Sequence, residues 1–169
     1  MPRIYGKTEI YNLLDQKGIS YDKLEHAAVF TMEEMDAAHI TDKGNVCKNL
    51  FLRDYKGNNH FLVTAPENKR VDLRALAETL ESSKLSFGSP ERLDKYLGVT
   101  QGSVSPLCIL NDENAEVTVI FDEDLKSETA IGVHPCDNTA TIWLSFTDLL
   151  KIIEDHGNKV EFAHFEKYE

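Results

Sequence analysis

The sequence predicts an α+β protein, with helices and strands mixed along one chain of 169 residues. Helical periodicity and strand-like alternation of apolar residues both recur, and the strands of the second half come in hairpin-like pairs without a regular alternation with helices. That order favours an irregular mixed sheet over a doubly wound fold. The length suits one domain with its own core, so we expect a single domain over residues 1–169.

The first forty residues predict two helices with a short strand between them. Residues 8–17 place apolar side chains at helical spacing and stop before a glycine, as in an amphipathic helix that packs on a core. Residues 21–26 read as a short strand. Thr31, followed three positions later by Glu34, is a capping box that predicts a second helix to about His39.

A β-hairpin is predicted next, from two apolar runs at 46–54 and 59–65. Between them, Gly57 and Asn58 are expected to supply the positive φ that a tight turn needs. The later elements follow from the same rules of periodicity and capping. They are helices at 72–80 and 89–98, strands at 107–110, 116–121 and 138–144, a helix at 146–156 and a last strand at 159–165.

Charge and hydropathy exclude several classes of protein. No run of about 18 apolar residues exists and the first residues lack the apolar stretch of a signal peptide, so we expect a cytoplasmic protein without a membrane anchor. The net charge of −11 argues against a wide nucleic-acid-binding face. Residues 41–74 are nevertheless basic, with seven Lys or Arg against four Asp or Glu, which favours a small local anion site.

Three cysteines are widely spaced and contain no Cys-x-x-Cys pair. Cys47, Cys108 and Cys136 therefore suggest neither a disulfide framework nor a zinc knuckle, and we expect reduced thiols. His134, Cys136 and Asp137 are metal ligands by type, but a single close pair is a weak metal signal. A Cys-His nucleophilic pair has as little support, because nothing brings Cys47 or Cys108 to His134.

Lys48 stands at the head of an apolar strand-like run and lies, by alternation, on the side of Leu50 and Leu52. Such a lysine either snorkels at a sheet edge or points into a pocket. The pattern alone favours the edge, because lysine is almost never buried without a partner.

Two later stretches can present polar groups to a ligand. Residues 102–106, Gly-Ser-Val-Ser-Pro, form a loop whose backbone N–H groups suit a carbonyl oxygen or a developing oxyanion, although an ordinary turn is the more common reading. His134 precedes Pro135 in a turn-rich stretch before a strand, where rigid backbone holds side chains that remain accessible.

Six stretches of the chain carry a family likeness that runs in order through about residues 8–165: they are 25–34, 47–54, 68–80, 85–107, 109–125 and 133–157. Taken together, these stretches resemble the YbaK/EbsC superfamily, and within it the ProX/PrdX-type branch of free-standing relatives of the prolyl-tRNA synthetase editing domain. Small departures are Ala27-Ala28, where relatives often have Pro-Pro, and Cys136 after His134-Pro135.

The resemblance implies a hydrolase for misacylated tRNA(Pro), with alanyl-tRNA(Pro) as the substrate of this branch, and a compact mixed domain around a curved, barrel-like sheet. The partner that it implies is the acceptor end of tRNA(Pro) carrying alanine, and prolyl-tRNA synthetase stays open as a second partner. It implies neither a cofactor nor a metal. The family's functional positions carry over to this sequence as follows. The catalytic ones match Lys48, Gly102 and His134, and those that bind substrate match Phe30, Thr31, Met32, Asn49, Ser103 and Pro106.

The same resemblance suggests a role for each group. Lys48 would bind the phosphate or ribose of the terminal adenosine, and the backbone around Gly102 would stabilise the oxyanion. His134 would orient the aminoacyl group or the water, and whether it is also a base stays open. Two rivals remain: a cysteinyl-tRNA(Pro) deacylase, and a module that binds aminoacyl-tRNA without hydrolysing it.

Overall fold

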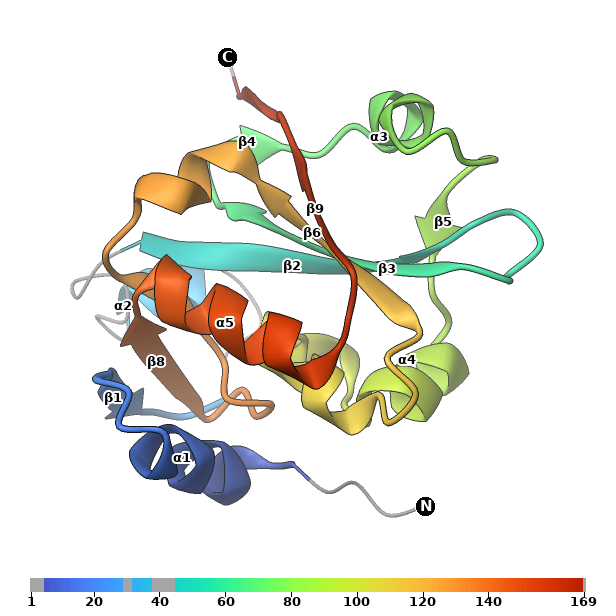
Figure 1. Cartoon of the computed structure of the whole chain (residues 1–169). Helices are drawn as coiled ribbons and strands as arrows, with labels where there is room; N and C mark the ends of the chain where they lie inside the picture. Colours follow the sequence, from blue (N-terminus) through green and yellow to red (C-terminus); the bar gives the residue numbers. More distant parts are fainter. Residues whose placement is uncertain (1–4, 29–31, 38–44, 169) are drawn as a thin grey trace.

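The structure, a computed structural model, describes residues 5–28, 32–37 and 45–168 (Figure 1). The helices of that part of the chain are α1 (Lys7–Gln16), α2 (Met32–Ala37), α3 (Leu73–Thr79), α4 (Pro90–Leu97) and α5 (Phe146–His156), with 3₁₀ helices η2 (Gln101–Ser103), η3 (Pro106–Asn111) and η4 (Glu123–Ser127). The strands are β1 (Asp22–Glu25), β2 (Asn45–Arg53), β3 (His60–Pro66), β4 (Lys69–Arg70), β5 (Ser86–Phe87), β6 (Val117–Asp122), β7 (Ile131–Val133), β8 (Ala140–Leu144), β9 (Val160–Ala163) and β10 (Glu166–Lys167).

Most strands belong to one mixed sheet in the order β1-β8-β7-β2-β3-β6-β9, with β5 paired to β2. The β2-β3 and β7-β8 pairs are antiparallel, whereas β2-β7, β3-β6 and β6-β9 are parallel. Strands β4 and β10 form a small sheet of their own. The predicted mixed α/β class is confirmed. Within the described residues no pairing joins β1 to β9, so the sheet is open and not closed into a barrel.

The central strands pack two apolar clusters, one on each face of the sheet. One face lies against α1, α4, η3 and α5, and α5 lies at the front of Figure 1, below β2. The other face is covered by α3 and the C-terminal segment. Representative members of the first cluster are Cys47, Phe51, Leu62, Val119, Phe121, Leu149 and Ile153, and of the second Leu52, Phe61, Val63, Leu76, Ile120 and Phe165.

The predicted helices begin and end where their capping residues indicate. The Asp72 side chain accepts hydrogen bonds from the first turn of α3, and Ser89 does the same for α4. Helix α4 ends at Gly98 and α5 ends at Gly157, both in the left-handed region that favours glycine. Helix α2 was predicted from a capping box at Thr31, which lies outside the described residues.

The predicted hairpin is β2 with β3, paired antiparallel over 47–53 and 60–66. Gly57 has a φ of +74°, as expected, whereas Asn58 is not among the residues with positive φ. The expectation for Asn58 was therefore wrong. Asp54 closes the turn instead, because its Oδ1 accepts the backbone N–H of Asn58 at 2.8 Å.

The apolar run 107–110 was predicted as a strand, and this was wrong: it lies in η3. Ser105 caps that helix by accepting the N–H of Leu107, and Pro106 occupies its first position, where proline needs no N–H partner. A short apolar run does not distinguish a buried strand from a buried helix. The sequence analysis also missed the short strands β4, β5, β7 and β10.

Candidate functional site

Strand β2 is paired along one edge and open in the middle of the other. β3 pairs with residues 47–53 on the first edge. On the second edge, β7 pairs with Asn45 and Val46, and β5 pairs with Leu52 and Arg53. No strand of the described chain pairs with the stretch between them. The middle of β2 is therefore where loops and a ligand can reach the sheet.

A hollow of about 170 Å³ lies along this open stretch. Strand β2, the turn that leads into α4 and the loop after α4 form its walls. Gly88 donates its N–H to the carbonyl of Phe51 at 2.9 Å, and a Cβ at position 88 would stand 2.5 Å from the Phe51 ring, so only glycine allows this approach. The lining residues are Asn49, Leu50, Phe51, Phe87, Gly88, Pro90, Leu93, Gln101 and Val104.

Lys48 and Asn49 project to opposite faces of β2. Asn49 lines the hollow, and its Oδ1 accepts a hydrogen bond from Thr64 Oγ1 at 2.7 Å. That bond directs the Asn49 carbonyl away from a ligand and leaves its amide N–H groups as donors. Lys48 is half-buried and donates to Tyr168 Oη at 3.1 Å. Burial raises the pKa of nearby Glu67, and the charge of Lys48 opposes that rise.

The loop predicted to bind an oxyanion contains η2, the break before Ser105 and the start of η3. Gly102 is the second residue of η2, where the backbone N–H groups lack partners inside the helix. Ser103 N–H is already bonded to Thr100 O at 3.0 Å, and Pro106 has no N–H to offer. Gly102 thus lies in the first turn of η2, and its neighbours Gln101 and Val104 line the hollow.

Ser103 connects this loop to the turn that follows His134. Its hydroxyl accepts the backbone N–H of Asn138 at 3.1 Å, although the two residues are far apart in sequence, and Ser103 is buried. The carbonyl of Ser103 also accepts the thiol of Cys108 at 3.6 Å. Two of the predicted segments are thus held together by a backbone-to-hydroxyl bond.

His134 follows β7 directly, so the pairing of that strand fixes the position of the backbone at His134. Its Nδ1 lies 2.8 Å from the carbonyl oxygen of Ala140, an acceptor only, so Nδ1 carries the proton and Nε2 is left as an acceptor. Burial lowers the pKa of His134, and His26 lowers it further, against the raising effects of the Ala140 bond and Asp137. The ring is therefore neutral near pH 7.

The turn after His134 is short and strained at one position. Cys136 is buried and adopts a φ of +61°, which is uncommon for a residue with a side chain. Asp137 closes the turn by accepting both the N–H and the hydroxyl of Thr139, at 2.9 and 2.6 Å. Strain of this kind often accompanies a functional site, where it holds a side chain in place.

His26 lies beside His134, with ring centroids 6.3 Å apart. Its Nδ1 faces the carbonyl of Ala27 at 2.8 Å and its Nε2 faces Thr141 Oγ1 at 3.0 Å. Both ring nitrogens are therefore occupied, so the hydrogen bonds of His26 are satisfied within the protein. Its contribution to the site is to shape the surroundings of His134.

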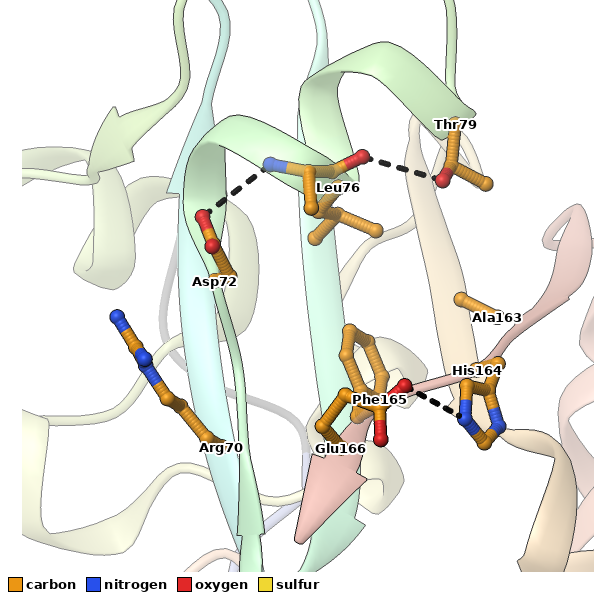
Figure 2. A pocket seen from close by; sticks show the side chains of 9 residues that line it. Arg70, Asp72, Leu76, Thr79, Ala163, His164, Phe165 and Glu166 are labelled. Atoms are coloured by element: carbon orange, nitrogen blue, oxygen red, sulfur yellow. Dashed lines mark hydrogen bonds and ion pairs between the residues drawn. The ribbon is translucent and has the colours of Figure 1, made fainter. Parts of the chain in front are cut away.

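A second hollow, of about 150 Å³, lies on the other face of the sheet between α3 and the C-terminal segment (Figure 2). Several of its polar side chains already have partners: Asp72 caps α3, and His164 pairs with Glu123 and Glu166 at 3.1 and 3.3 Å. This hollow does not contain any of the residues predicted for the site.

A family model described as the aminoacyl-tRNA editing domain matches residues 26–152, about three quarters of the chain. The chain belongs to this family. The match includes Lys48, the Gly102–Pro106 loop and His134, so the positions carried over by resemblance lie inside the editing domain.

Curated relatives support the same assignment. The prolyl-tRNA editing protein ProX of Acetoanaerobium sticklandii is 47% identical over 153 residues, which cover 90% of this chain and 93% of that protein. The prolyl-tRNA synthetase associated domain-containing protein 1 of Danio rerio is 34% identical, over 88% of this chain and 82% of that one.

Solved structures share the fold. A protein assigned provisionally as a trans-editing enzyme for prolyl-tRNA synthetase gives a TM-score of 0.69 at 21% identity and covers 94% of this chain and 95% of its own. The crystal structure of hypothetical protein APE2540 gives 0.69 at 16% identity, over 92% and 97%. At these identities the likeness concerns the fold of the editing domain alone.

The structure brings some of the predicted residues together and not others. Of the predicted residues that the structure describes, Asn49 alone lines the hollow, where the loop contributes its neighbours Gln101 and Val104. Ser103 joins that loop to the turn after His134. The hydrogen bond of Lys48 goes to Tyr168 instead of to either segment. Phe30 and Thr31 lie outside the described residues, as does the side chain of Met32.

The sequence analysis did not single out Phe87, Gln101 or Tyr168. Phe87 is 60% exposed, an unusual state for a large apolar side chain, and it lines the hollow together with Gln101. Its neighbour Gly88 was the available signal, because an isolated glycine beside an aromatic residue often marks a close backbone approach.

Within the described ranges, no group of three or more His, Cys, Asp and Glu side chains is placed to hold a metal ion, and no helix could span a membrane.

Proposed function

We propose that this protein hydrolyses alanyl-tRNA(Pro) to alanine and tRNA(Pro), acting as an editing enzyme separate from the synthetase. The observation that carries the proposal is the 47% identity, over 90% of the chain, to prolyl-tRNA editing protein ProX. The match covers 93% of that relative, which is therefore a protein of about this size and not a domain of a large synthetase.

Editing of this kind corrects errors that arise because a synthetase has limited selectivity for its amino acid. A synthetase pocket built for proline cannot strongly exclude the smaller alanine, because a missing methylene changes binding by only about 1–3 kcal/mol. A second site that admits alanine and excludes proline removes the mischarged product. The second partner consistent with this role is prolyl-tRNA synthetase, the enzyme that releases the substrate.

The reaction is attack of water on the ester that joins alanine to the terminal ribose. Negative charge develops on the carbonyl oxygen, and a preorganised N–H donor stabilises it; loss of one such donor typically slows a reaction by about 10²–10³-fold. We assign this role to Gly102 N–H. The bond between Ser103 and Asn138 supports the assignment because it holds the loop against the His134 turn.

His134 would accept a hydrogen bond at Nε2 from the attacking water or from the ammonium group of alanine. The bond from Nδ1 to Ala140 O orients the ring, and the lowered pKa keeps Nε2 unprotonated near neutral pH. The substrate's own 2′-hydroxyl can assist the water, so the mechanism needs no enzyme nucleophile. The buried thiols fit this view, because burial raises the pKa of Cys47 to about 12.

Lys48 would bind the phosphate of the terminal nucleotide. Its ammonium is a mobile point charge on a half-buried stem, in the one basic region of an acidic chain. Its place within β2, one residue before Asn49, would let one strand contact both the phosphate and the hollow. Exchange of the Tyr168 hydrogen bond for a phosphate oxygen replaces a neutral acceptor by a charged one, which strengthens the contact.

Single-turnover deacylation of Ala-, Cys- and Pro-tRNA(Pro) tests the proposal. We expect Ala-tRNA(Pro) to be hydrolysed fastest, Pro-tRNA(Pro) to persist, and the rates to be unchanged by a chelator. Fastest release of cysteine would instead support the cysteinyl-tRNA(Pro) deacylase. Binding of all three without release would support the non-catalytic module, and loss of activity in chelator would overturn the metal-independent mechanism.

A further inference from the structure

The C-terminal segment is fixed to the body of the protein by its own set of contacts. β10 pairs antiparallel with β4, in the register Glu166↔Arg70, and Tyr168 N–H donates to Asn68 O at 3.1 Å. In Figure 1 this segment continues β9 past the edge of the main sheet toward β4. The last residues of the described chain are therefore held in a defined place.

An ion cluster secures this segment, with Lys69 and Asp122 buried and Asp124 exposed. Lys69, only 3% exposed, lies 3.4 Å from Asp122 and 2.8 Å from Asp124, and its Nζ also donates to Phe165 O at 2.8 Å. Asp122, itself fully buried, accepts Phe165 N–H at 3.1 Å. Burial lowers the pKa of Lys69, but the two carboxylates raise it above its ordinary value overall.

Burying Lys69 and Asp122 costs their hydration, which the ion pair and the hydrogen bonds around it must offset. Here the partners include both backbone groups of Phe165, just before β10. None of the three charged groups belongs to the proposed catalytic site. Their evident effect is to hold the C-terminal segment against β4.

The result of this anchoring is the position of Tyr168 beside Lys48. The Lys48 ammonium lies 4.8 Å from the centre of the Tyr168 ring and bonds its hydroxyl at 3.1 Å, while 59% of the tyrosine stays exposed. A cation over an aromatic face is a favourable contact, and it leaves ring surface open to solvent. An anion-binding lysine and an exposed aromatic ring therefore lie side by side.

We propose that Tyr168 is a stacking site for the terminal adenine of the tRNA, next to the phosphate contact of Lys48. The inference rests on the proposed function, which gives Lys48 the terminal nucleotide. A base and its phosphate belong to the same nucleotide, so a ring beside the phosphate contact lies within reach of the base. Exposed aromatic rings beside basic groups bind single-stranded ends in this manner, because every base has a π-face.

The alternative is that Tyr168 covers Lys48, so that the substrate must displace the tyrosine before it can bind the lysine. The two roles predict opposite effects of removing the ring. A stacking site loses affinity when the ring is removed, whereas a cover gains affinity because Lys48 becomes free. A Tyr168→Phe variant separates them further, since it keeps the ring and removes only the hydroxyl that bonds Lys48.

The test measures binding by fluorescence anisotropy of an RNA microhelix that ends in a terminal adenosine with alanine in amide linkage, which is not hydrolysed. We expect about tenfold weaker binding for Tyr168→Ala and Tyr168→Leu, and near-parent binding for Tyr168→Phe. Tyr55→Ala is the matched control, because Tyr55 is 71% exposed but lies in the β2-β3 hairpin turn. Urea unfolding of each variant checks that the fold is kept.

A second microhelix, in which the terminal base is replaced by hydrogen, identifies what the ring contacts. Parent and Tyr168→Ala should bind this RNA equally weakly. The inference is overturned if Tyr168→Ala binds the adenosine-ended RNA as the parent does or more tightly, or if the difference persists without the base.

Hydrolysis by the parent protein is measured separately, so the two proposals fail in different ways. If the parent does not release alanine from Ala-tRNA(Pro) but the base-dependent loss at Tyr168 is found, the proposed function falls and the stacking site stands. If the parent is active and Tyr168→Ala binds like the parent, only the stacking site falls.

Discussion

The two edges of strand β2 are built for different tasks. On the β3 edge, antiparallel pairing is continuous over residues 47–53, and β6 and β9 extend it into the core. On the other edge, strands pair only at the two ends, and loops surround a hollow in the middle. One strand thus connects a rigid core to a site that needs free backbone edges and accessible side chains.

The two edges of β2 separate the stability of this small protein from its function. The paired edge satisfies its backbone groups within the sheet, so changes there act on folding. The open edge depends on single hydrogen bonds between loops, such as the bond from Asn138 N–H to Ser103. Changes there should affect the reaction more than the fold.

The largest expected effect tests the paired edge. Leu62 lies in β3 and is fully buried, so Leu62→Ala should lower the free energy of unfolding by about 3 kcal/mol, within the usual range of 2–5 for such a change. Urea unfolding measures this. Tyr55→Ala, an exposed change in the adjoining turn, should alter it by less than about 0.5 kcal/mol.

The same variant should keep the single-turnover deacylation rate at a temperature where it is fully folded. A tenfold slower rate in folded Leu62→Ala would break the comparison, because the paired edge would then be part of the reactive machinery.

The next effect concerns Lys48. Lys48→Met keeps the length of the stem and removes the charge, so kcat/KM for Ala-tRNA(Pro) should fall by about 10–100-fold, since hydrogen bonds to charged groups contribute about 1.5–3 kcal/mol. The free energy of unfolding should change little, because the partner Tyr168 is largely exposed. Steady-state kinetics measures the first quantity.

Lys56→Met is the matched control for Lys48→Met. Lys56 carries the same charge in the same basic region but lies exposed in the hairpin turn. Equal losses in both variants would show that the net charge of the region matters and that no specific contact is made at Lys48.

Most of the fold followed from local rules, because its signals are local. The caps Asp72 and Ser89 and the end at Gly157 fixed three helices to within a residue or two, and the hairpin followed from its two apolar runs. Run 107–110 was misread as a strand because four buried apolar residues carry no period of their own. The strands β4 and β10 are two residues long and exist only through their pairing.

The site was less accessible from the sequence for the same reason. Local patterns marked Lys48 and His134 as candidates, and the family resemblance selected them. The contacts between distant segments had no local signal: Ser103 meets Asn138 only because β7 and η2 converge on β2. Likewise, nothing in the last four residues predicts that Tyr168 lies over Lys48.

A smaller effect concerns the pH dependence that His134 gives to the open edge. Its pKa is lowered below the ordinary value of 6.5 by burial and by His26, and its proposed role needs the neutral ring. As the pH falls through that lowered pKa, Nε2 binds a proton and kcat/KM should fall about tenfold per pH unit. Well above that lowered pKa, this group should cause no further change.

His134→Asn should lack that acidic limb while retaining a reduced rate. The exposed His164 supplies the control, since His164→Asn should keep the parent profile.

The folded protein also resists protonation of His134, so the parent should lose some stability as the pH falls below 6.5, and His134→Asn should lose less. An unchanged limb in His134→Asn would remove His134 from the pH dependence of the reaction.

The smallest effect compares two serines of one loop. Ser103 and Ser105 are both buried and each hydroxyl accepts one backbone N–H, from Asn138 and from Leu107 respectively, both at 3.1 Å. Replacing either serine by alanine should lower the free energy of unfolding by about 1 kcal/mol, because the backbone N–H loses the hydroxyl oxygen that accepts its hydrogen bond. The two variants should therefore have similar free energies of unfolding.

Their rates should differ, because only the Ser103 bond joins the loop to the His134 turn. Ser103→Ala should slow single-turnover deacylation by about tenfold, since a small displacement of Gly102 N–H from the His134 turn weakens the alignment of the reacting groups. Ser105→Ala loses only the cap of η3 and should keep the parent rate. Equal rates in the two variants would show that the contact between loop and turn supports the fold and does not align the site.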